Sequence, residues 1–249
     1  MTQLRFAVAA CIAAFLLGGC AQEPFYKTEH IYNESATELA EGAKDSLRLK
    51  IDVDIPVNAP ASVVGTITKS LFGEMCTAKD VANAVESYRK GAVKSYRETN
   101  MPLWEEYEDK DSTPMALNWE EVLEGYFSGE HIGIVSYTVV RYCYTGGAHG
   151  MTTENALNFD KKSGKTITEE DIFIAGYEEK LNALLTANVK DVIGEDGVLF
   201  VDKIEANGNF CVSENGITYI YNQYDIAPYA MGIIRIPVVW ESLSEVLKE

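Results

Sequence analysis

The chain has 249 residues, of which 47% are hydrophobic and 24% are charged, which is enough for one sizeable domain or two small ones. It carries 38 Asp and Glu against 21 Lys and Arg, a formal net charge of −17. This acidity excludes binding to nucleic acid or to an anionic lipid surface by counterion release. It would attract a basic protein, although acidity alone also keeps an exported protein soluble.

Residues 1–19 have the pattern of a lipoprotein signal peptide. Arg5 supplies a positive charge, and the apolar run 6–17 is too short to cross a bilayer as a lone helix. Small residues precede Cys20, the residue that is acylated in bacterial lipoproteins, and acyl chains on one residue anchor a protein without a transmembrane helix. The alternative is an ordinary secreted protein. Ala21 is not the aspartate that retains lipoproteins at the inner membrane in enteric bacteria, which favours the outer membrane, facing the periplasm.

The first half of the remaining chain predicts a tether, a strand and a helix. Residues 20–45 are polar without a convincing period and are predicted to lift the domain off the membrane. Residues 46–55 alternate strictly between apolar and polar side chains, which predicts a half-buried strand. Residues 80–96 place apolar side chains on one stripe of an amphipathic helix. Residues 119–126 and 131–144 predict two long strands around a turn at 128–130.

The second half predicts a strand, a helix and a hairpin. Residues 152–159 are interpreted as a strand followed by a turn that lacks the oxygen ligands of a calcium loop. Residues 177–192 are predicted to form an amphipathic helix. Asn215-Gly216 between two alternating runs is a strong hairpin signal, and residues 233–239 predict a last strand before a short helix.

Two passages, 142–150 and 221–232, combine glycines and aromatics where a strand is expected to end. Gly146 and Gly147 would let a ligand approach the backbone, and histidine is the side-chain type suited to proton transfer near neutral pH, so His149 is the best catalytic candidate. The alternative is structural, with the glycines at positive φ in a bend and His149 bonded to a neighbouring strand. The sequence contains no G-x-S-x-G, no H-E-x-x-H and no phosphate-binding loop.

Tyrosines are concentrated in the second passage. Clustered tyrosines on a rigid turn suit recognition of a protein or a sugar, because they offer contact area at little entropic cost. They suit a loop packed on its own core equally well. The predicted binding residues are Tyr144, Gly146, Gly147, His149, Tyr221, Tyr224 and Tyr229.

Three cysteines lie beyond the signal peptide: Cys76, Cys143 and Cys211. An odd number cannot all pair, and a bridge between Cys143 and Cys211 requires their strands to be neighbours. The absence of C-x-x-C and the presence of only three histidines argue against a metal site. We expect no metal and no cofactor.

Several passages taken together carry a resemblance. They are 144–150, then Asn158-Phe159-Asp160 with Ser163-Gly164-Lys165 and Asp171-Ile172-Phe173, and finally 221–232. In this order they resemble the paired extracytoplasmic domains of unknown function of the RsiV anti-sigma factor and of the PdaC peptidoglycan deacetylase.

The resemblance spans roughly residues 47–247 and implies an α+β fold of antiparallel sheets with packed helices. It implies two associated subdomains, a PdaC-like part at 46–150 and an RsiV-like part at 151–249. In RsiV this region is a receptor that binds lysozyme. The chain lacks the sigma-binding segment and transmembrane helix of RsiV and the deacetylase domain of PdaC, so the resemblance supplies no catalytic residue.

The sequence therefore predicts a non-catalytic, lipid-anchored binding protein of the cell envelope. Its expected partner is a basic protein such as lysozyme, or peptidoglycan glycan. The alternative is a cell-wall glycan or peptide hydrolase that uses His149 with Asp160 or Asp225 as its acid–base set. A third hypothesis is a purely structural envelope module.

Overall fold

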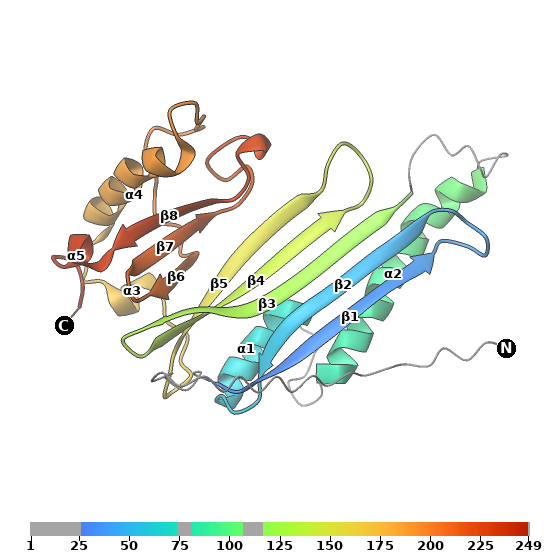
Figure 1. Ribbon diagram of the computed structural model, residues 1–249, viewed down its shortest axis with the longest axis horizontal. Helices are drawn as coiled ribbons and strands as arrows, with labels where there is room; N and C mark the ends of the chain where they lie inside the picture. The colour runs from blue at the N-terminus through green and yellow to red at the C-terminus, as the bar shows by residue number, and fades with distance from the viewer. Residues whose placement is uncertain (1–25, 74–80, 107–116, 249) are drawn as a thin grey trace, which may run out of the picture.

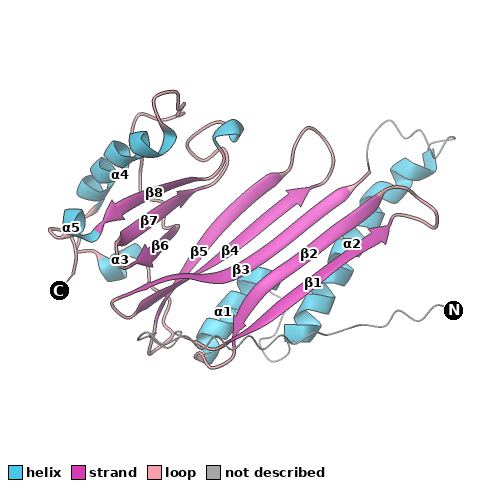
Figure 2. Cartoon of the chain, viewed as in Figure 1, coloured by secondary structure: helices cyan, strands magenta, loops and turns pink. Residues whose placement is uncertain are grey.

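The computed structural model describes residues 26–73, 81–106 and 117–248. The predicted α+β class is confirmed, with a five-stranded sheet, a three-stranded sheet and helices packed on both (Figures 1 and 2). The predicted signal peptide and Cys20 lie outside the described residues, as does Cys76.

The larger sheet has its strands in chain order. They are β1 (Thr28–Glu38), β2 (Ser46–Pro56), β3 (Trp119–His131), β4 (Ile134–Tyr144) and β5 (Met151–Asp160). All neighbouring pairs are antiparallel except β2 and β3, which are parallel. The sheet is therefore mixed, because the chain crosses from β2 to β3 through two helices, α1 (Ala61–Phe72) and α2 (Val81–Glu106), and returns in the same direction.

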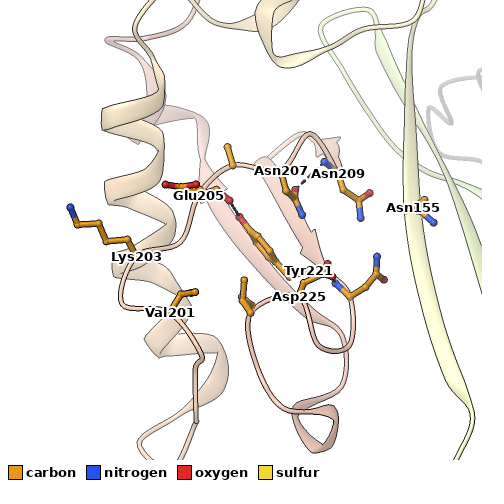
Figure 3. Close-up of a pocket in the computed structure, with 11 residues that line it drawn as sticks. Asn155, Val201, Lys203, Glu205, Asn207, Asn209, Tyr221 and Asp225 are labelled. Carbon is orange, nitrogen blue, oxygen red and sulfur yellow. Dashed lines mark hydrogen bonds between the residues drawn. The ribbon is translucent and has the colours of Figure 1, made fainter.

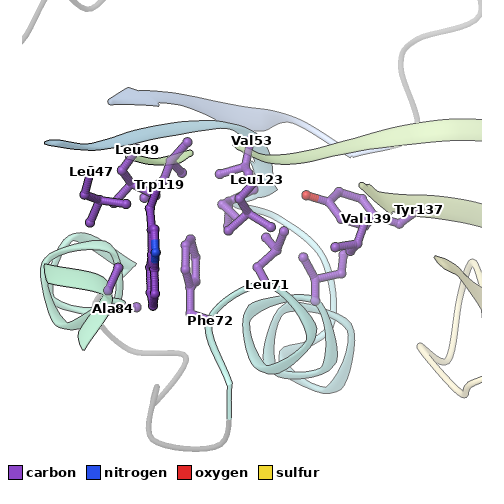
Figure 4. Packing of buried hydrophobic residues seen from close by; sticks show 14 of the residues in the cluster. Leu47, Leu49, Val53, Leu71, Phe72, Ala84, Trp119, Leu123, Tyr137 and Val139 are labelled. Atoms are coloured by element: carbon purple, nitrogen blue, oxygen red, sulfur yellow. The ribbon is translucent and has the colours of Figure 1, made fainter. Parts of the chain in front are cut away.

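The alternation of apolar and polar side chains in β2 gives the half-buried strand that the sequence predicts. Its apolar side chains are buried on the face that α1 and α2 cover, whereas the intervening polar ones are half-buried or exposed. Figure 4 shows Trp119 and Phe72 side by side between the sheet and the two helices, with Leu123 and Leu71 beside them. Burial of this apolar layer is the main stabilising contribution to the larger subdomain.

The tether prediction is wrong for residues 28–38, which form strand β1. This strand pairs with β2 over its whole length at the edge of the sheet. None of its side chains is fully buried, and only one face is half-buried, where Ile31 packs against the core. An edge strand with a single large apolar side chain facing inward has too weak a periodic signal to be recognised from sequence.

The predicted turn at 128–130 is also wrong. The hairpin turns four residues later, at Ile132 and Gly133, and β3 instead has a bulge between Phe127 and Gly129. A Cβ at Gly129 would lie 1.9 Å from the carbonyl oxygen of Val212. Gly129 is therefore required because the backbone of another strand passes directly over it.

The predicted boundary at residue 150 is wrong as well. β5 pairs with β4 along ten residues, and its Phe159 is fully buried in the core of the larger sheet. The larger subdomain therefore extends to Asp160, and a single isolated bridge continues the pairing from Phe159 to Thr166.

The smaller subdomain has a core of its own. Its elements are α3 (Glu169–Ile172), α4 (Glu178–Ile193), β6 (Phe210–Ser213), β7 (Gly216–Tyr221), the 3-10 turn η1 (Tyr229–Met231), β8 (Ile234–Val239) and α5 (Trp240–Leu243). The helix and hairpin predicted for this part are confirmed, and β7 is central between β6 and β8. β6 contacts β3, β4 and β5, so the smaller sheet lies against the β5 side of the larger one (Figure 1).

Candidate functional site

Two loops from different subdomains meet, and they are the two passages that the sequence singles out. His149, between β4 and β5, stacks on Tyr229 with ring centroids 3.8 Å apart and planes 23° from parallel. Tyr224 and Tyr229 both lie between β7 and β8. The Tyr224 hydroxyl is 3.4 Å from His149 Nε2, and the ring centroids of Tyr224 and Tyr229 are 5.8 Å apart. We refer to His149, Tyr224 and Tyr229 as the aromatic cluster.

The β4–β5 loop is folded back on the end of β4. Gly146 and Gly147 have φ of 92° and 90°, so the expectation of positive φ at this bend is confirmed. The Tyr144 hydroxyl donates to the carbonyl oxygen of Gly147 at 3.1 Å. The ring of Tyr142 occupies the space that a side chain at Gly150 would need. The structural alternative for His149 was a bond to a neighbouring strand. Within residues 26–73, 81–106 and 117–248, its ring instead contacts the Gly150 carbonyl oxygen and the Tyr224 hydroxyl and stacks on Tyr229.

Tyr224 has an unusual backbone conformation. Its φ of 72° lies in the left-handed region, which costs a residue with a Cβ about 1 kcal/mol. The turn is held by neighbouring hydrogen bonds: Gln223 Oε1 accepts from the Thr152 amide, and Asp225 accepts from the Asn222 amide. The strained turn leaves the Tyr224 side chain 47% exposed, and a residue kept in such a conformation is a marker of function.

Tyr221, the remaining tyrosine predicted to bind, does not reach the cluster. It is only 2% exposed, and its hydroxyl donates to the carbonyl oxygen of Glu205. Burial raises the pKa of this phenol above its ordinary value. Tyr221 is therefore part of the core, as expected where period-two alternation continues to the end of β7.

Polar contacts between the edge of β5 and residues of the smaller subdomain, Asn209, Asn222 and Arg235 among them, hold the two loops together. We refer to these contacts as the seam. The free edge of β5 is bonded by side-chain amides: Glu154 N–H donates to Asn222 Oδ1, and Ala156 N–H donates to Asn209 Oδ1. Asn209 in turn donates to the carbonyl oxygen of Glu154. These amides satisfy the edge groups that would otherwise be open to another strand.

A buried ion pair lies in the same seam. Glu154 is 4% exposed, and both its oxygens accept from Arg235 of β8, with Nε 3.1 Å from Oε1. The hydrogen bond to Glu154 raises the pKa of the Arg235 guanidinium. Beyond it, Asn158 donates to the carbonyl oxygen of Phe210 and accepts from Ser136. The seam was not predicted from the sequence. Asparagines are common in ordinary loops, so those that flank the short strands here gave no sign of a contact between subdomains.

The hydrolase alternative does not find its acid–base set at this site. Among the described residues, His149 has two hydrogen-bonding contacts, the carbonyl oxygen of Gly150 and the hydroxyl of Tyr224. Asp160 is at the opposite end of β5, where it accepts from Ser163, and Asp225 accepts from Asn222. In the described part of the chain, no carboxylate is hydrogen-bonded to the ring, whereas a histidine general base is ordinarily oriented by such a group.

The two cysteines that the structure describes are free, so the bridge considered between Cys143 and Cys211 is not formed. Cys143 lies on the face of β4 whose residues point toward α1 and α2, whereas Cys211 lies on β6 against the opposite face. Burial raises the pKa of both thiols. In the described ranges, no group of three or more His, Cys, Asp or Glu side chains could hold a metal ion.

The comparisons with known proteins agree with this architecture. Residues 170–241 match the family described as Protein of unknown function (DUF3298). A crystal structure of a DUF3298 member from Bacteroides fragilis superposes with a TM-score of 0.80 at 26% identity, covering 90% of this chain and 94% of the other. The chain resembles the DUF3298 proteins. A DUF3298 protein from Pseudomonas aeruginosa shares the fold, with a TM-score of 0.60 at 18% identity over 90% and 94% of the two chains.

One curated relative confirms the resemblance to PdaC-like domains. The chain is 29% identical over 116 residues to the peptidoglycan-N-acetylmuramic acid deacetylase PdaC of Bacillus subtilis (strain 168). The match covers 43% of this chain and 25% of the deacetylase, so it spans about a quarter of that relative's length. In the parts of the chain that the structure describes, no helix has the length and apolar character needed to cross a bilayer.

Proposed function

We propose that this protein is a non-catalytic receptor of the cell envelope that binds a basic, lysozyme-like protein through the aromatic cluster. The observation that carries the proposal is the cluster of His149, Tyr224 and Tyr229, built by two loops of different subdomains, in which His149 and Tyr224 are exposed and Tyr229 is half-buried. The rings are fixed before any partner arrives, so little side-chain freedom is lost on binding.

The surface beside the cluster suits a cationic partner. The segment before β6 lies along the Tyr224 loop, because the Phe200 amide donates to the carbonyl oxygen of Ile226. This segment exposes Val198, Phe200 and Val201. The chain near this segment also carries exposed acidic residues, namely Asp191, Glu195, Asp196, Asp202 and Glu205, and Asp225 directly follows Tyr224. Apolar and aromatic contact area together with exposed acidic residues favours a partner of opposite charge.

The envelope location is part of the same proposal. The curated relative is named as a peptidoglycan deacetylase, and the sequence before the described residues has the lipoprotein pattern ending at Cys20. We propose an anchor of acyl chains on Cys20, in the outer membrane and facing the periplasm. Incorporation of labelled palmitate into the wild-type protein, and its loss in Cys20→Ser, is the expected result. Equal labelling of both proteins, or labelling of neither, would contradict the anchor.

The decisive experiment is a titration with a c-type lysozyme at about 20 mM and 200 mM salt. The protein used must include β1, because a chain that starts at residue 45 lacks the edge strand that pairs with β2. We expect saturable binding that weakens with salt, since exposed charges are screened over a Debye length of about 10 Å at 0.1 M.

Variants of the cluster separate the site from the fold. Tyr224→Gly removes the ring and relieves the left-handed strain, and Tyr229→Ala removes the stack on His149. Each should weaken binding about tenfold or more, as for an aromatic residue at the centre of an interface. Tyr32→Ala, which removes a tyrosine that is exposed on β1, is the matched control and should bind like wild type. Equal affinity of all four proteins would exclude the cluster as the contact.

A further inference from the structure

A cavity of about 740 Å³ lies between β5 and the segment 201–209, and the aromatic cluster does not line it. Figure 3 shows Tyr221 in the middle of the lining, with Asn155 on β5 at one side and Val201 and Lys203 at the other. The volume is within the range of sites that hold small ligands, about 300–1,000 Å³.

The wall formed by 201–209 has no helix or strand, yet hydrogen bonds fix it at several points. The Ile204 amide donates to Thr186 Oγ1, and the Ala206 amide donates to Asn182 Oδ1, both on α4. On the inner side, the Tyr221 hydroxyl donates to the carbonyl oxygen of Glu205. An irregular wall held in this way is preorganised, which lowers the entropic cost of binding.

The lining includes polar groups that the fold does not use. In the part of the chain that the structure describes, the side chains of Asn155, Lys203 and Glu205 have no hydrogen-bond or ion-pair partner. Asp225 uses Oδ2 to accept from the Asn222 amide, which leaves Oδ1 available. Figure 3 shows the side chains of Lys203 and Glu205 extending away from Tyr221 and β5, so the cavity itself offers the carboxamide of Asn155 and one carboxylate oxygen of Asp225, beside apolar contact area from Val201.

This set of groups selects the chemistry of a ligand. The Asp225 carboxylate, with no cationic group beside it in the cavity interior, disfavours an anion. The described residues contain no group of three His, Cys, Asp or Glu side chains for a metal ion. A neutral ligand with both hydroxyl donors and acceptors, and with C–H faces between them, satisfies the Asn155 carboxamide and the Asp225 carboxylate together. We propose that the cavity binds a neutral oligosaccharide.

A second cavity extends the site beyond one sugar ring. It has about 520 Å³ and shares Ala206 and Asn207 with the first, so the two are adjacent along β5. Its lining adds Leu157, Thr168 and Glu169, although the Thr168 hydroxyl already donates to Glu170 and the Glu169 carboxylate already accepts from Tyr177 and Gly208. The combined length of the two cavities therefore fits a chain of sugars better than a monosaccharide.

The test is a calorimetric titration of the full-length protein with chitotetraose, cellotetraose and maltotetraose as neutral probes, and with sodium phosphate as an anion. At least one oligosaccharide should bind saturably and phosphate should not. Asn155→Ala, which removes the carboxamide, and Asn155→Trp, which places a large ring on an exposed strand position over the cavity, should each raise the Kd at least tenfold. Glu214→Ala, an exposed acid in the β6–β7 turn, should leave the Kd unchanged.

The outcomes are distinct from those of the receptor proposal. Tyr224→Gly should bind the oligosaccharide like wild type, because its ring is outside the cavity lining. No saturable binding of any of the three sugars would overturn the proposal. Binding that survives both cavity variants, or that Tyr224→Gly alone abolishes, would also overturn it, since the sugar would then occupy another surface.

Discussion

The interiors of the two subdomains and the seam between them differ in the polarity of their side chains. Each interior is a cluster of aliphatic and aromatic side chains. The seam instead collects polar groups: four of the seven buried polar side chains in the described ranges lie on β4 and β5, namely Ser136, Thr138, Glu154 and Asn158. Apolar burial is non-directional, whereas hydrogen bonds are directional. The interiors therefore stabilise each subdomain, and the seam determines how the two are oriented.

The difference has a functional consequence, because the aromatic cluster takes its rings from both sides of the seam. Asn222 and Gln223, which bond the β5 edge, directly precede Tyr224 in the chain. A change in the seam should therefore move the rings, whereas a change in one interior should reduce stability without a selective effect on the cluster.

The largest effect is expected from the interior. Phe159→Ala removes a fully buried ring from β5 and leaves a cavity, which should lower the free energy of unfolding by about 3–5 kcal/mol. Chemical denaturation monitored by tryptophan fluorescence measures the loss. A decrease below about 1 kcal/mol would show that this end of β5 does not belong to the larger core.

A smaller loss is expected when the ion pair of the seam is broken. Arg235→Met leaves the buried Glu154 carboxylate without its guanidinium partner. Loss of one partner of a fully buried pair costs about 3–5 kcal/mol, and because Arg235 is itself half exposed we expect about 2 kcal/mol.

The double variant Arg235→Met with Glu154→Gln is the control. It removes the buried charge as well, so part of the lost stability should return, and the two single effects should not add. Strict additivity of the two substitutions would mean that the ion pair has no energetic role in the seam.

Asn209→Ala tests the side-chain hydrogen bonds that the seam makes to the edge of β5, and its expected effect is smaller. It removes the acceptor for the Ala156 amide and a donor to Glu154, which should cost about 1–2 kcal/mol. Hydrogen exchange of the Ala156 amide should accelerate, while that of amides in β2 stays unchanged. Asn188→Ala, which removes a hydrogen bond inside the smaller subdomain, should leave Ala156 protected. Equal protection of the Ala156 amide in both variants would contradict the role of Asn209 in the seam.

Sequence patterns predicted the elements whose signal is local. The strict alternation of 46–55, the stripe of α4 and the Asn215-Gly216 turn each reflect a periodicity or a turn preference within a few residues. Composition also singled out the passages 142–150 and 221–232, although nothing local to either passage indicated that their rings would meet.

Long-range contacts were not predictable in the same way. β1 is polar on both faces because it is an edge strand, so its pairing with β2 leaves almost no pattern. Gly129 was interpreted as a turn residue because nothing nearby in sequence indicates that Val212 passes over it. The amides of the seam resemble ordinary loop residues until the partner edge of β5 is known.

The smallest expected effect is a gain in stability at the β3–β4 turn, far from the seam. Ile132 and Gly133 have φ of 46° and 78°, which is the pattern of a type I′ turn. A β-branched residue is strained in this conformation, and Ile132 is 84% exposed, so its side chain gains little from burial. Asn is preferred at this position of the turn. Ile132→Asn should therefore raise the free energy of unfolding by about 0.5–1 kcal/mol.

Urea denaturation measures this gain as a higher midpoint with an unchanged m-value. Val57→Asn is the matched control, because Val57 is also an exposed aliphatic residue but does not have a positive φ. The control separates relief of backbone strain from the general effect of replacing an exposed apolar side chain by a polar one. If both variants gained equally, the turn would hold no strain. If only Ile132→Asn gained, the gain would come from relief of backbone strain at this turn.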